Sequence, residues 1–497
     1  MDVSKLNAIL NVGLPIWILV AGGLLSVLID AIFGRKSSFL VYLVGILSLI
    51  FSFCASFIKW TGDNADLRLD FLVLDSMTIF FIVVILLIAF FSLLNSYSYL
   101  KVSPFLQKNS SNLKNAYVSL ILFSVVGMIF MFASDQLILN FIGLETMSLA
   151  IYILVGSNRR DSFACEAAIK YFVLGSVASA ILLLGIALFY ASYATFQLSE
   201  MATVAIQPDK LILPQLSAVF LLVGVFFKLS IAPFHFWTPD AYTGAPTPVT
   251  GFMASGVKIA GFAFLMRLLL NFKSIPSDPL VTIMQAGVVL TLIVGNLGAI
   301  FQDNIKRMLA YSSIAHAGYI LLGLVVGFKD GVFDPQVTSS VLFYLLSYAV
   351  MTLGAFGVLS VMVNDDHEVT TFKDLAGLSS KRPALALVFS VFMISFLGIP
   401  PTIGFFAKYG IFSFAIQNGY YELSIFAIIT SLASAYYYLR PIKVMYFDEA
   451  TEDSSIPKVP FPLMLSIMLC LVATILLGII PDSFVKISQQ AVSILQQ

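Results

Sequence analysis

The chain has 497 residues, of which 59% are apolar and only 11% are charged, and its net charge is zero. Soluble proteins carry about 25% charged residues, so this composition predicts a membrane protein with many spans. The balanced charge gives no electrostatic reason to expect nucleic-acid binding. The sequence also lacks a CxxC motif and any cluster of His and Cys with the spacing of a zinc, haem or iron–sulfur site.

Fourteen apolar runs are long enough to cross a bilayer as helices, which takes about 20 residues each. No hydrophilic stretch between them is long enough for a soluble domain, so we expect one all-α polytopic membrane domain. The first run lacks a small-residue cleavage site, and we expect it to be retained. The predicted spans are 13–33, 38–58, 73–96, 115–133, 135–155, 166–193, 212–236, 250–270, 280–301, 305–327, 338–363, 384–415, 421–446 and 460–481.

Basic residues are distributed unequally between the two sets of alternating loops. Most of them, Lys306 among them, fall in the loops of one side, as in the pairs Arg159-Arg160 and Lys381-Arg382. Loops rich in Lys and Arg remain in the cytoplasm. Together with the even number of spans, this bias predicts that both termini lie on the non-cytoplasmic side.

The most unusual stretch runs from residue 226 to residue 258, FFKLSIAPFHFWTPDAYTGAPTPVTGFMASGVK. Lys228 lies inside an apolar run that Pro233 must interrupt, because proline removes a helical hydrogen bond and clashes with the preceding turn. Lys258 lies near the middle of the next run. A lysine deep in a membrane helix is costly and indicates function, and broken helices occur where they are buried or line a wet cavity. This pattern predicts an ion path.

A second interrupted run, FLGIPPTIGFFAKYGIFS at 396–413, carries Lys408 after the pair Pro400-Pro401. Here the prolines precede the lysine, whereas Pro233 follows Lys228. Interrupted spans at corresponding places in two halves indicate a transport site between inverted repeats. The alternative for these lysines is an ion pair that serves only packing.

Glu145 lies about ten residues into its span, near mid-membrane at 1.5 Å rise per residue. A carboxylate in hydrocarbon stays charged only beside a cation, and we expect Lys228 to be that cation. Such a pair suits switching, because a proton on one group alters the energy of the other. The alternative is an ion pair that holds two helices together.

His316 lies on the span 305–327, and histidine titrates near neutral pH, so it is a candidate proton relay. The alternative is a histidine bonded only to its helix neighbours. We expect Lys170 and Arg267, near the ends of their spans, to reach the membrane interface. The three tyrosines at 436–438 are expected to be packing residues rather than a binding site.

Three of these stretches together resemble a known family. FKLSIAPFHFWTPDAYTGAPTPVTGFMASGVKIAGF, DNIKRMLAYSSIAHAGY and LILNFIGLETMSLAIY are similar to the antiporter-like membrane subunits of proton-pumping NADH–quinone oxidoreductase, respiratory complex I. The resemblance covers about residues 70–450. It is greatest to the branch called subunit N in bacteria, because the chain ends soon after its last span, and because Lys408 stands where subunit M has a glutamate.

The resemblance implies two inverted five-helix repeats, each with one discontinuous helix. It divides the chain into N-terminal helices (1–114), a first repeat (115–270), a second repeat (280–446) and a C-terminal helix (460–497). It also implies that Glu145, Lys228, Lys258, His316 and Lys408 translocate protons. This function couples electron transfer from NADH to quinone to proton pumping in a bacterial inner membrane.

The resemblance further implies that this chain binds no redox cofactor. NADH, FMN, iron–sulfur clusters and quinone would be bound by partner subunits, and the membrane partners would be subunits M, K, J, A and H. Three alternatives stay open: a subunit of a multisubunit Na⁺/H⁺ antiporter, the equivalent subunit of a ferredoxin- or hydrogenase-linked complex, and a structural scaffold whose lysines only bridge helices.

Overall fold

The computed structural model describes residues 10–61, 67–69, 71–102, 113–159, 161–203, 211–272, 277–329, 332–362, 368, 370–449 and 459–492. Within these ranges, thirteen helices are long and apolar enough to span a membrane. Two shorter apolar helices, α17 (Pro383–Leu397) and α18 (Ile403–Gln417), cover the remaining predicted span. The prediction of an all-α polytopic membrane protein is therefore confirmed.

The helices follow one another along the chain and are joined by short connections. Those up to the first break are α2 (Leu14–Phe33), α3 (Ser38–Thr61), α4 (Ser76–Val102), α6 (Leu113–Ala133), α7 (Leu137–Val155), α8 (Ser162–Tyr193) and α9 (Ile212–Leu229). The rest are α10 (Trp237–Gly244), α11 (Thr247–Phe252), a π-helical turn η4 (Met253–Val257), α12 (Lys258–Asn271), α13 (Ser277–Ile300), α14 (Ile305–Gly327), α15 (Pro335–Val361), α16 (Leu378–Lys381), α17, α18, α19 (Tyr421–Ala433), α20 (Ala435–Phe447), α21 (Phe461–Ile479) and α22 (Asp482–Val492).

Two short antiparallel hairpins, which the sequence pattern did not predict, lie in the connections between helices. They pair β1 (Leu67–Leu69) with β2 (Leu72–Leu74), and β3 (Phe328–Lys329) with β4 (Val332–Phe333). Each hairpin lies directly before a membrane span, α4 in the first case and α15 in the second.

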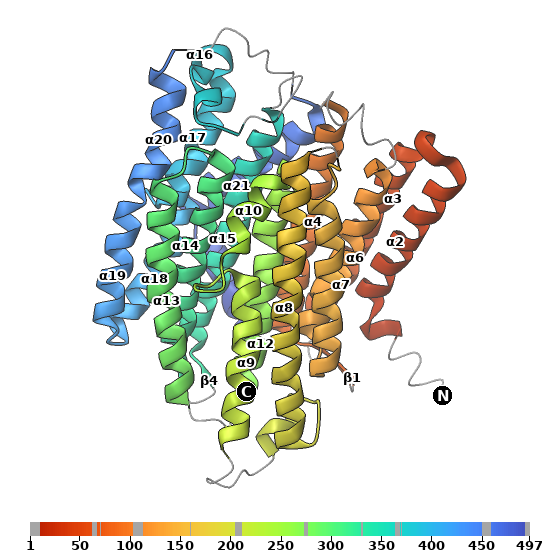
Figure 1. The fold of residues 1–497 in the computed structure, drawn as a ribbon, viewed down its shortest axis with the longest axis vertical. Coiled ribbons are helices and arrows are strands. Elements are labelled where there is room, and N and C mark those ends of the chain that lie inside the picture. Colours follow the sequence, from red (N-terminus) through yellow and green to blue (C-terminus); the bar gives the residue numbers. More distant parts are fainter. Residues whose placement is uncertain are drawn as a thin grey trace.

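Three spans form the centre of the bundle: the continuous segment α11–η4–α12, then α14, then α15. Nearly all their residues are buried. A helix that is apolar on every side belongs in the interior, and the central spans follow this rule. The pairs α2–α3 and α19–α20 lie at opposite edges of the molecule (Figure 1) and expose large apolar side chains such as Ile32 and Leu432. The ionisable side chains deep in the central spans, Lys258 and His316, are therefore enclosed by protein.

The first broken helix ends at Leu229, where Ser230 adopts a left-handed conformation with φ of 61°. The polar groups freed by the break find partners within the protein. The Trp237 indole donates to the Phe227 carbonyl at 2.8 Å, and the Ala232 amide donates to the Thr291 hydroxyl at 2.9 Å. Broken backbone at membrane depth requires such partners.

The second break lies between α17 and α18, where Gly398 has φ of 88°. A left-handed glycine ends α17, because it has no Cβ to clash in this conformation. The amide of Gly404 donates to the Ser395 hydroxyl at 3.3 Å, which joins the two half-helices across the break. Both interruptions expected from the proline positions are present, while the division into 1–114, 115–270, 280–446 and 460–497 stays a prediction.

Candidate functional site

Lys228 lies in the last turn of α9, directly before the first break, and is 4% exposed. A cation there is favoured by the negative end of the helix dipole. Its ammonium donates to the Ser148 hydroxyl of α7 at 2.6 Å, and the rings of Tyr152 and Tyr171 lie 5.7 and 5.5 Å away. The lysine is thus held by a hydroxyl and two aromatic faces.

The predicted direct contact between Glu145 and Lys228 is wrong. Glu145 instead accepts a hydrogen bond from the Ser179 hydroxyl of α8, and no ion pair joins it to Lys228. Ser148, which contacts Lys228, lies three residues after Glu145 and so one helical turn away. Each of the two charged groups is therefore hydrogen-bonded to a serine, Glu145 to Ser179 and Lys228 to Ser148.

Lys258 is the first residue of α12, directly after the π-helical turn, and is 1% exposed. Its ammonium donates to the Ser313 carbonyl of α14 at 2.5 Å and also contacts the Ser313 hydroxyl. The Tyr348 ring of α15 lies 5.6 Å from the ammonium. Lys258 therefore reaches from one central span to the two others.

His316 lies on α14 one turn beyond Ser313 and is 2% exposed. Its Nδ1 is 2.7 Å from the Tyr344 hydroxyl, and its Nε2 is 3.1 Å from the Tyr438 hydroxyl. Both ring nitrogens therefore contact side chains of other helices, and the alternative of a histidine bonded only to its own helix is wrong. One of the two nitrogens must accept a hydrogen bond when the ring is neutral.

Lys408, on α18, is 5% exposed. We refer to the four buried groups Lys228, Lys258, His316 and Lys408 as the central row. The Lys408 ammonium donates to the Leu397 carbonyl and to the Ser431 hydroxyl, each at 2.9 Å, with the Tyr319 ring 5.3 Å away. Leu397 is the last residue of α17. The ammonium of Lys408 thus lies at the carboxyl end of α17, the half-helix before the second break, although Lys408 itself belongs to α18. Lys228 is itself a residue of the carboxyl end of α9, the half-helix before the first break.

Hydroxyl groups hold this row together, and sequence reasoning missed them. Ser148, Ser313 and Ser431 each accept from one of the three lysines, and Tyr438 joins His316 to Ser312. The sequence signal that could have found these hydroxyls is a serine three residues away from an ionisable side chain, as Ser313 is from His316. Residues with this spacing lie on one face of a helix. The tyrosines at 436–438 were expected only to pack; Tyr438 is buried but also contacts His316.

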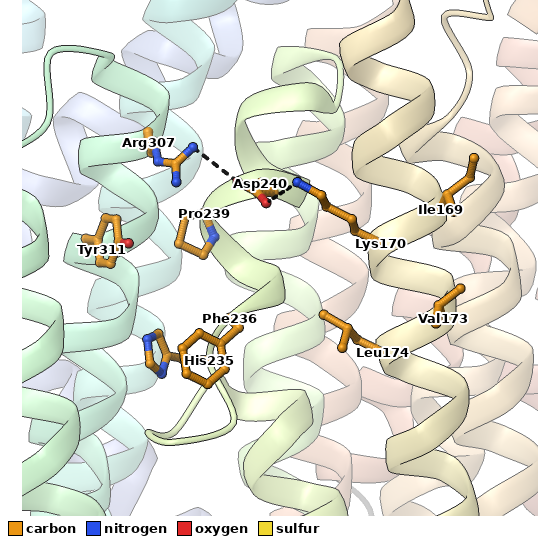
Figure 2. Close-up of a pocket in the computed structure, with 10 residues that line it drawn as sticks. All are labelled: Ile169, Lys170, Val173, Leu174, His235, Phe236, Pro239, Asp240, Arg307 and Tyr311. Carbon is orange, nitrogen blue, oxygen red and sulfur yellow. Dashed lines mark hydrogen bonds and ion pairs between the residues drawn. The ribbon is translucent and has the colours of Figure 1, made fainter.

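An open groove of about 640 Å³ lies beside the first break, between α8, α10 and α14. Figure 2 shows Lys170 and Arg307 on either side of Asp240, with His235 and Phe236 further along the groove. Asp240 pairs with Lys170 at 3.0 Å and with Arg307 at 3.1 Å. Lys170 is half-exposed, as expected, but it is held by Asp240 and by Glu166 at 2.7 Å.

The expectation that Arg267 reaches the membrane interface is wrong. Arg267 is 8% exposed, and its guanidinium pairs with Asp75 at 2.7 Å and donates to the Thr78 hydroxyl at 2.5 Å. Burial alone would raise the pKa of Asp75, but the charge and hydrogen bond of Arg267 and the bonds from Thr78 outweigh it and hold that pKa below its usual value. The pair joins α12 to the start of α4.

Lys306, assigned above to a solvent-facing loop, is also buried. It is the second residue of α14, is 1% exposed, and pairs with Glu368 at 2.8 Å. Residue type alone did not distinguish the buried Lys306 from its partly exposed neighbour Arg307. The two side chains differ because a helix turns about 100° between adjacent residues.

These features define a class: a polytopic membrane protein of the transporter type, in which two interrupted helices and a central polar row place ionisable groups deep in the bundle. Residues 134–434 match the family model described as NADH:quinone oxidoreductase/Mrp antiporter, TM. The chain belongs to this family.

Individual relatives agree with that placement. NADH-quinone oxidoreductase subunit N of Trichlorobacter lovleyi is 40% identical over 493 residues, covering 98% of this chain and 97% of the relative. The subunit N of Bdellovibrio bacteriovorus is 45% identical over 335 residues, covering 66% and 68%. A chain of respiratory complex I from Thermus thermophilus superposes with a TM-score of 0.79 at 32% identity, covering 95% of this chain and 98% of that one. A chain of the Mrp complex from Dietzia sp. has a TM-score of 0.81 at 19% identity, covering 99% and 97%, and shares the fold.

Proposed function

We propose that this chain is a proton-translocating membrane subunit of an NADH–quinone oxidoreductase. The observation that carries the proposal is the row Lys228, Lys258, His316 and Lys408, buried in the bundle and held by hydroxyls, carbonyls and aromatic rings. A buried ammonium without a counter-ion is costly, so the free-energy difference between its charged and neutral forms is small. Groups balanced in this way can take up and release protons during a cycle.

In the proposed route, protons enter from the cytoplasmic side and load Lys228 or Lys258. They cross the centre by way of His316 and leave by Lys408. Glu145 lies one helical turn from the serine that holds Lys228, so a change in its charge alters the energy of the next proton along the row. Redox chemistry elsewhere in the complex would drive these changes in turn.

The proposal places the redox reactions in other subunits. NADH, FMN, iron–sulfur clusters and quinone would be bound by partner chains, and the neighbours in the membrane would be subunit M and the small subunits K, J, A and H. The chain would lie in a bacterial inner membrane with both termini on the non-cytoplasmic side. Support comes from relatives named as subunit N over nearly the whole chain and from the match to respiratory complex I.

The test is to purify the complex through a tag on this chain, reconstitute it in vesicles and follow NADH-driven acidification of the interior. We expect quinone reduction coupled to acidification, and loss of that acidification in Glu145→Ala when the complex still assembles. NADH oxidation without acidification in the unaltered complex would falsify the proposal.

Fold similarity to the Mrp complex and to a membrane-bound sulfane sulfur reductase, the latter 25% identical with a TM-score of 0.81, favours a second candidate. The same row of lysines would serve a multisubunit Na⁺/H⁺ antiporter or a complex with another electron donor. Purification of an assembly without flavin and iron–sulfur subunits, which exchanges Na⁺ for H⁺, would support the antiporter.

A further inference from the structure

A carboxylate outside the membrane spans joins two of the central spans and α4. Glu368 lies in the connection after α15 and accepts from the amide and hydroxyl of Thr247 at 3.3 and 2.9 Å. It also accepts from the Lys306 ammonium at 2.8 Å and from the Tyr99 hydroxyl. Thr247 begins α11, Lys306 lies in the first turn of α14, and Tyr99 is on α4.

Each of these contacts suits a negative charge. The first turn of a helix presents unbonded amides and a positive dipole end, which a carboxylate satisfies. Lys306 is 1% exposed and needs a counter-ion. Its ammonium also donates to the Ala245 carbonyl at 2.6 Å, in the turn that leads into α11. Glu368 and Lys306 therefore tie the start of α14 to the start of α11 by two connected contacts.

The span 247–271, which begins with α11, and α14 also hold the contact between Lys258 and Ser313 in the central row. Lys258 follows Thr247 in the span 247–271, and Ser313 lies two turns after Lys306 on α14, about 10 Å along the axis at 1.5 Å per residue. A shift of one helix along the other by a single residue would remove the hydrogen bonds between Lys258 and Ser313. The far end of the same span is fixed by the pair of Arg267 and Asp75.

We propose that Glu368 is a positioning residue for proton translocation, which sets the register between the span 247–271 and α14 that places Lys258 on Ser313. This inference rests on the proposed function and adds to it a residue outside the row. Glu368 touches none of the groups that would carry the proton, and acts through Thr247 and Lys306.

The electrostatics of the contact keep it closed at neutral pH. Burial raises the pKa of Glu368, but the charge and hydrogen bond of Lys306, with bonds from Tyr99 and Thr247, lower it further, so the pKa lies below its usual value. The carboxylate is therefore ionised, and Lys306 always has its counter-ion. A permanent contact of this kind sets geometry and does not itself carry protons.

The experiment compares Glu368→Gln with the unaltered complex, reconstituted in vesicles. Glutamine keeps the size of the side chain but leaves Lys306 without an opposite charge. Protons moved per NADH oxidised are measured, because this ratio does not depend on how much complex assembles. Glu422→Gln is the matched control, since Glu422 is an exposed carboxylate on α19.

We expect Glu368→Gln to lower the ratio several-fold and Glu422→Gln to leave it unchanged. The double variant Lys306→Met with Glu368→Gln leaves no buried charge without a partner but still removes the contact, and we expect its ratio to stay about as low as in Glu368→Gln. If Glu368→Gln prevents assembly, the double variant still tests the inference, because a normal ratio without this contact would contradict its role in setting the register.

An unchanged ratio in Glu368→Gln, with normal acidification by the unaltered complex and by Glu422→Gln, would overturn this inference alone. If the unaltered complex oxidises NADH and moves no protons, the proposed function itself fails. The two failures are therefore distinguishable in one set of vesicles.

Discussion

The buried cations of this protein fall into two groups that differ in their partners. Lys228, Lys258 and Lys408, in the central row, donate to hydroxyl and carbonyl oxygens. Arg267 and Lys306, at the ends of central spans, pair with Asp75 and Glu368. None of the six ion pairs found among the described residues includes a lysine of the row.

In the proposed function, this difference separates the groups that change charge from the groups that keep it. A buried ion pair keeps both charges, because removing one leaves the other uncompensated at a cost of about 3–5 kcal/mol. A buried lysine with only neutral partners pays no such penalty when it loses its proton. The paired cations therefore hold helices in place, and in the proposed function the lysines of the row are the groups that take up and release protons.

The largest expected effect comes from removing a charge of the row. In Lys258→Met, the side chain keeps its length and apolar stem, and no carboxylate is left without a partner. We expect the complex to assemble and oxidise NADH while vesicle acidification is lost. Lys486→Met, at an exposed position on α22, is the control; equal acidification in both variants would contradict the role of Lys258.

A second variant converts the row into a paired site. Ser313→Asp places a carboxylate where Lys258 now meets a hydroxyl, and a nearby opposite charge favours the protonated lysine. We expect a large fall in acidification with normal assembly. Ser313→Ala is the matched control and should have a smaller effect, because the Ser313 carbonyl still accepts from Lys258. If Ser313→Asp pumps as well as Ser313→Ala, the lack of a carboxylate partner for Lys258 is not required for proton pumping.

The cations that are paired with carboxylates should affect stability more than proton pumping. Arg267→Met leaves Asp75 buried without its cation, and we expect a loss of about 3–5 kcal/mol in stability, seen as reduced assembly and a lower midpoint of thermal inactivation. The double variant Asp75→Asn with Arg267→Met should recover most of it. Protons moved per NADH should change little in the complex that assembles, and a fall in that ratio as large as in Lys258→Met would remove the distinction.

The same pair makes stability depend on pH. The folded protein holds the pKa of Asp75 below its unfolded value, so the folded state favours the ionised form. The resulting stabilisation is fully present above about pH 4 and is lost as the pH falls through the folded value. The double variant should therefore resist acid inactivation relative to its own stability at pH 7, measured as residual NADH oxidation after incubation at low pH.

The smallest expected effect concerns a hydroxyl of the row. Tyr438→Phe removes the group that joins His316 to Ser312 and keeps the ring packed against Phe396. A net hydrogen bond contributes about 0.5–1.5 kcal/mol, so we expect acidification to slow only a few-fold. Tyr436→Phe, at an exposed position, is the control. Complete loss of pumping would mean that Tyr438 itself carries the proton.

Much of the site was predictable from residue types alone. Lys228, Lys258 and Lys408 are conspicuous because charges are rare in apolar runs, and Pro233 and Pro400 mark breaks because proline cannot continue a helix. Thirteen of the fourteen predicted spans followed from run length in the same way. Each of these inferences depends on local chemistry, which the sequence contains in full.

The side-chain contacts between helices were not predictable from residue types. Glu145 was expected to contact Lys228 but meets Ser179. Arg267 was expected to reach the membrane interface and Lys306 to lie in a loop, but both are paired and buried. Composition and helical period determined that this chain spans a membrane with deep charges and two broken helices. Only the tertiary structure decided which charges are paired, because a contact between helices depends on their rotation and register, which distant parts of the chain set together.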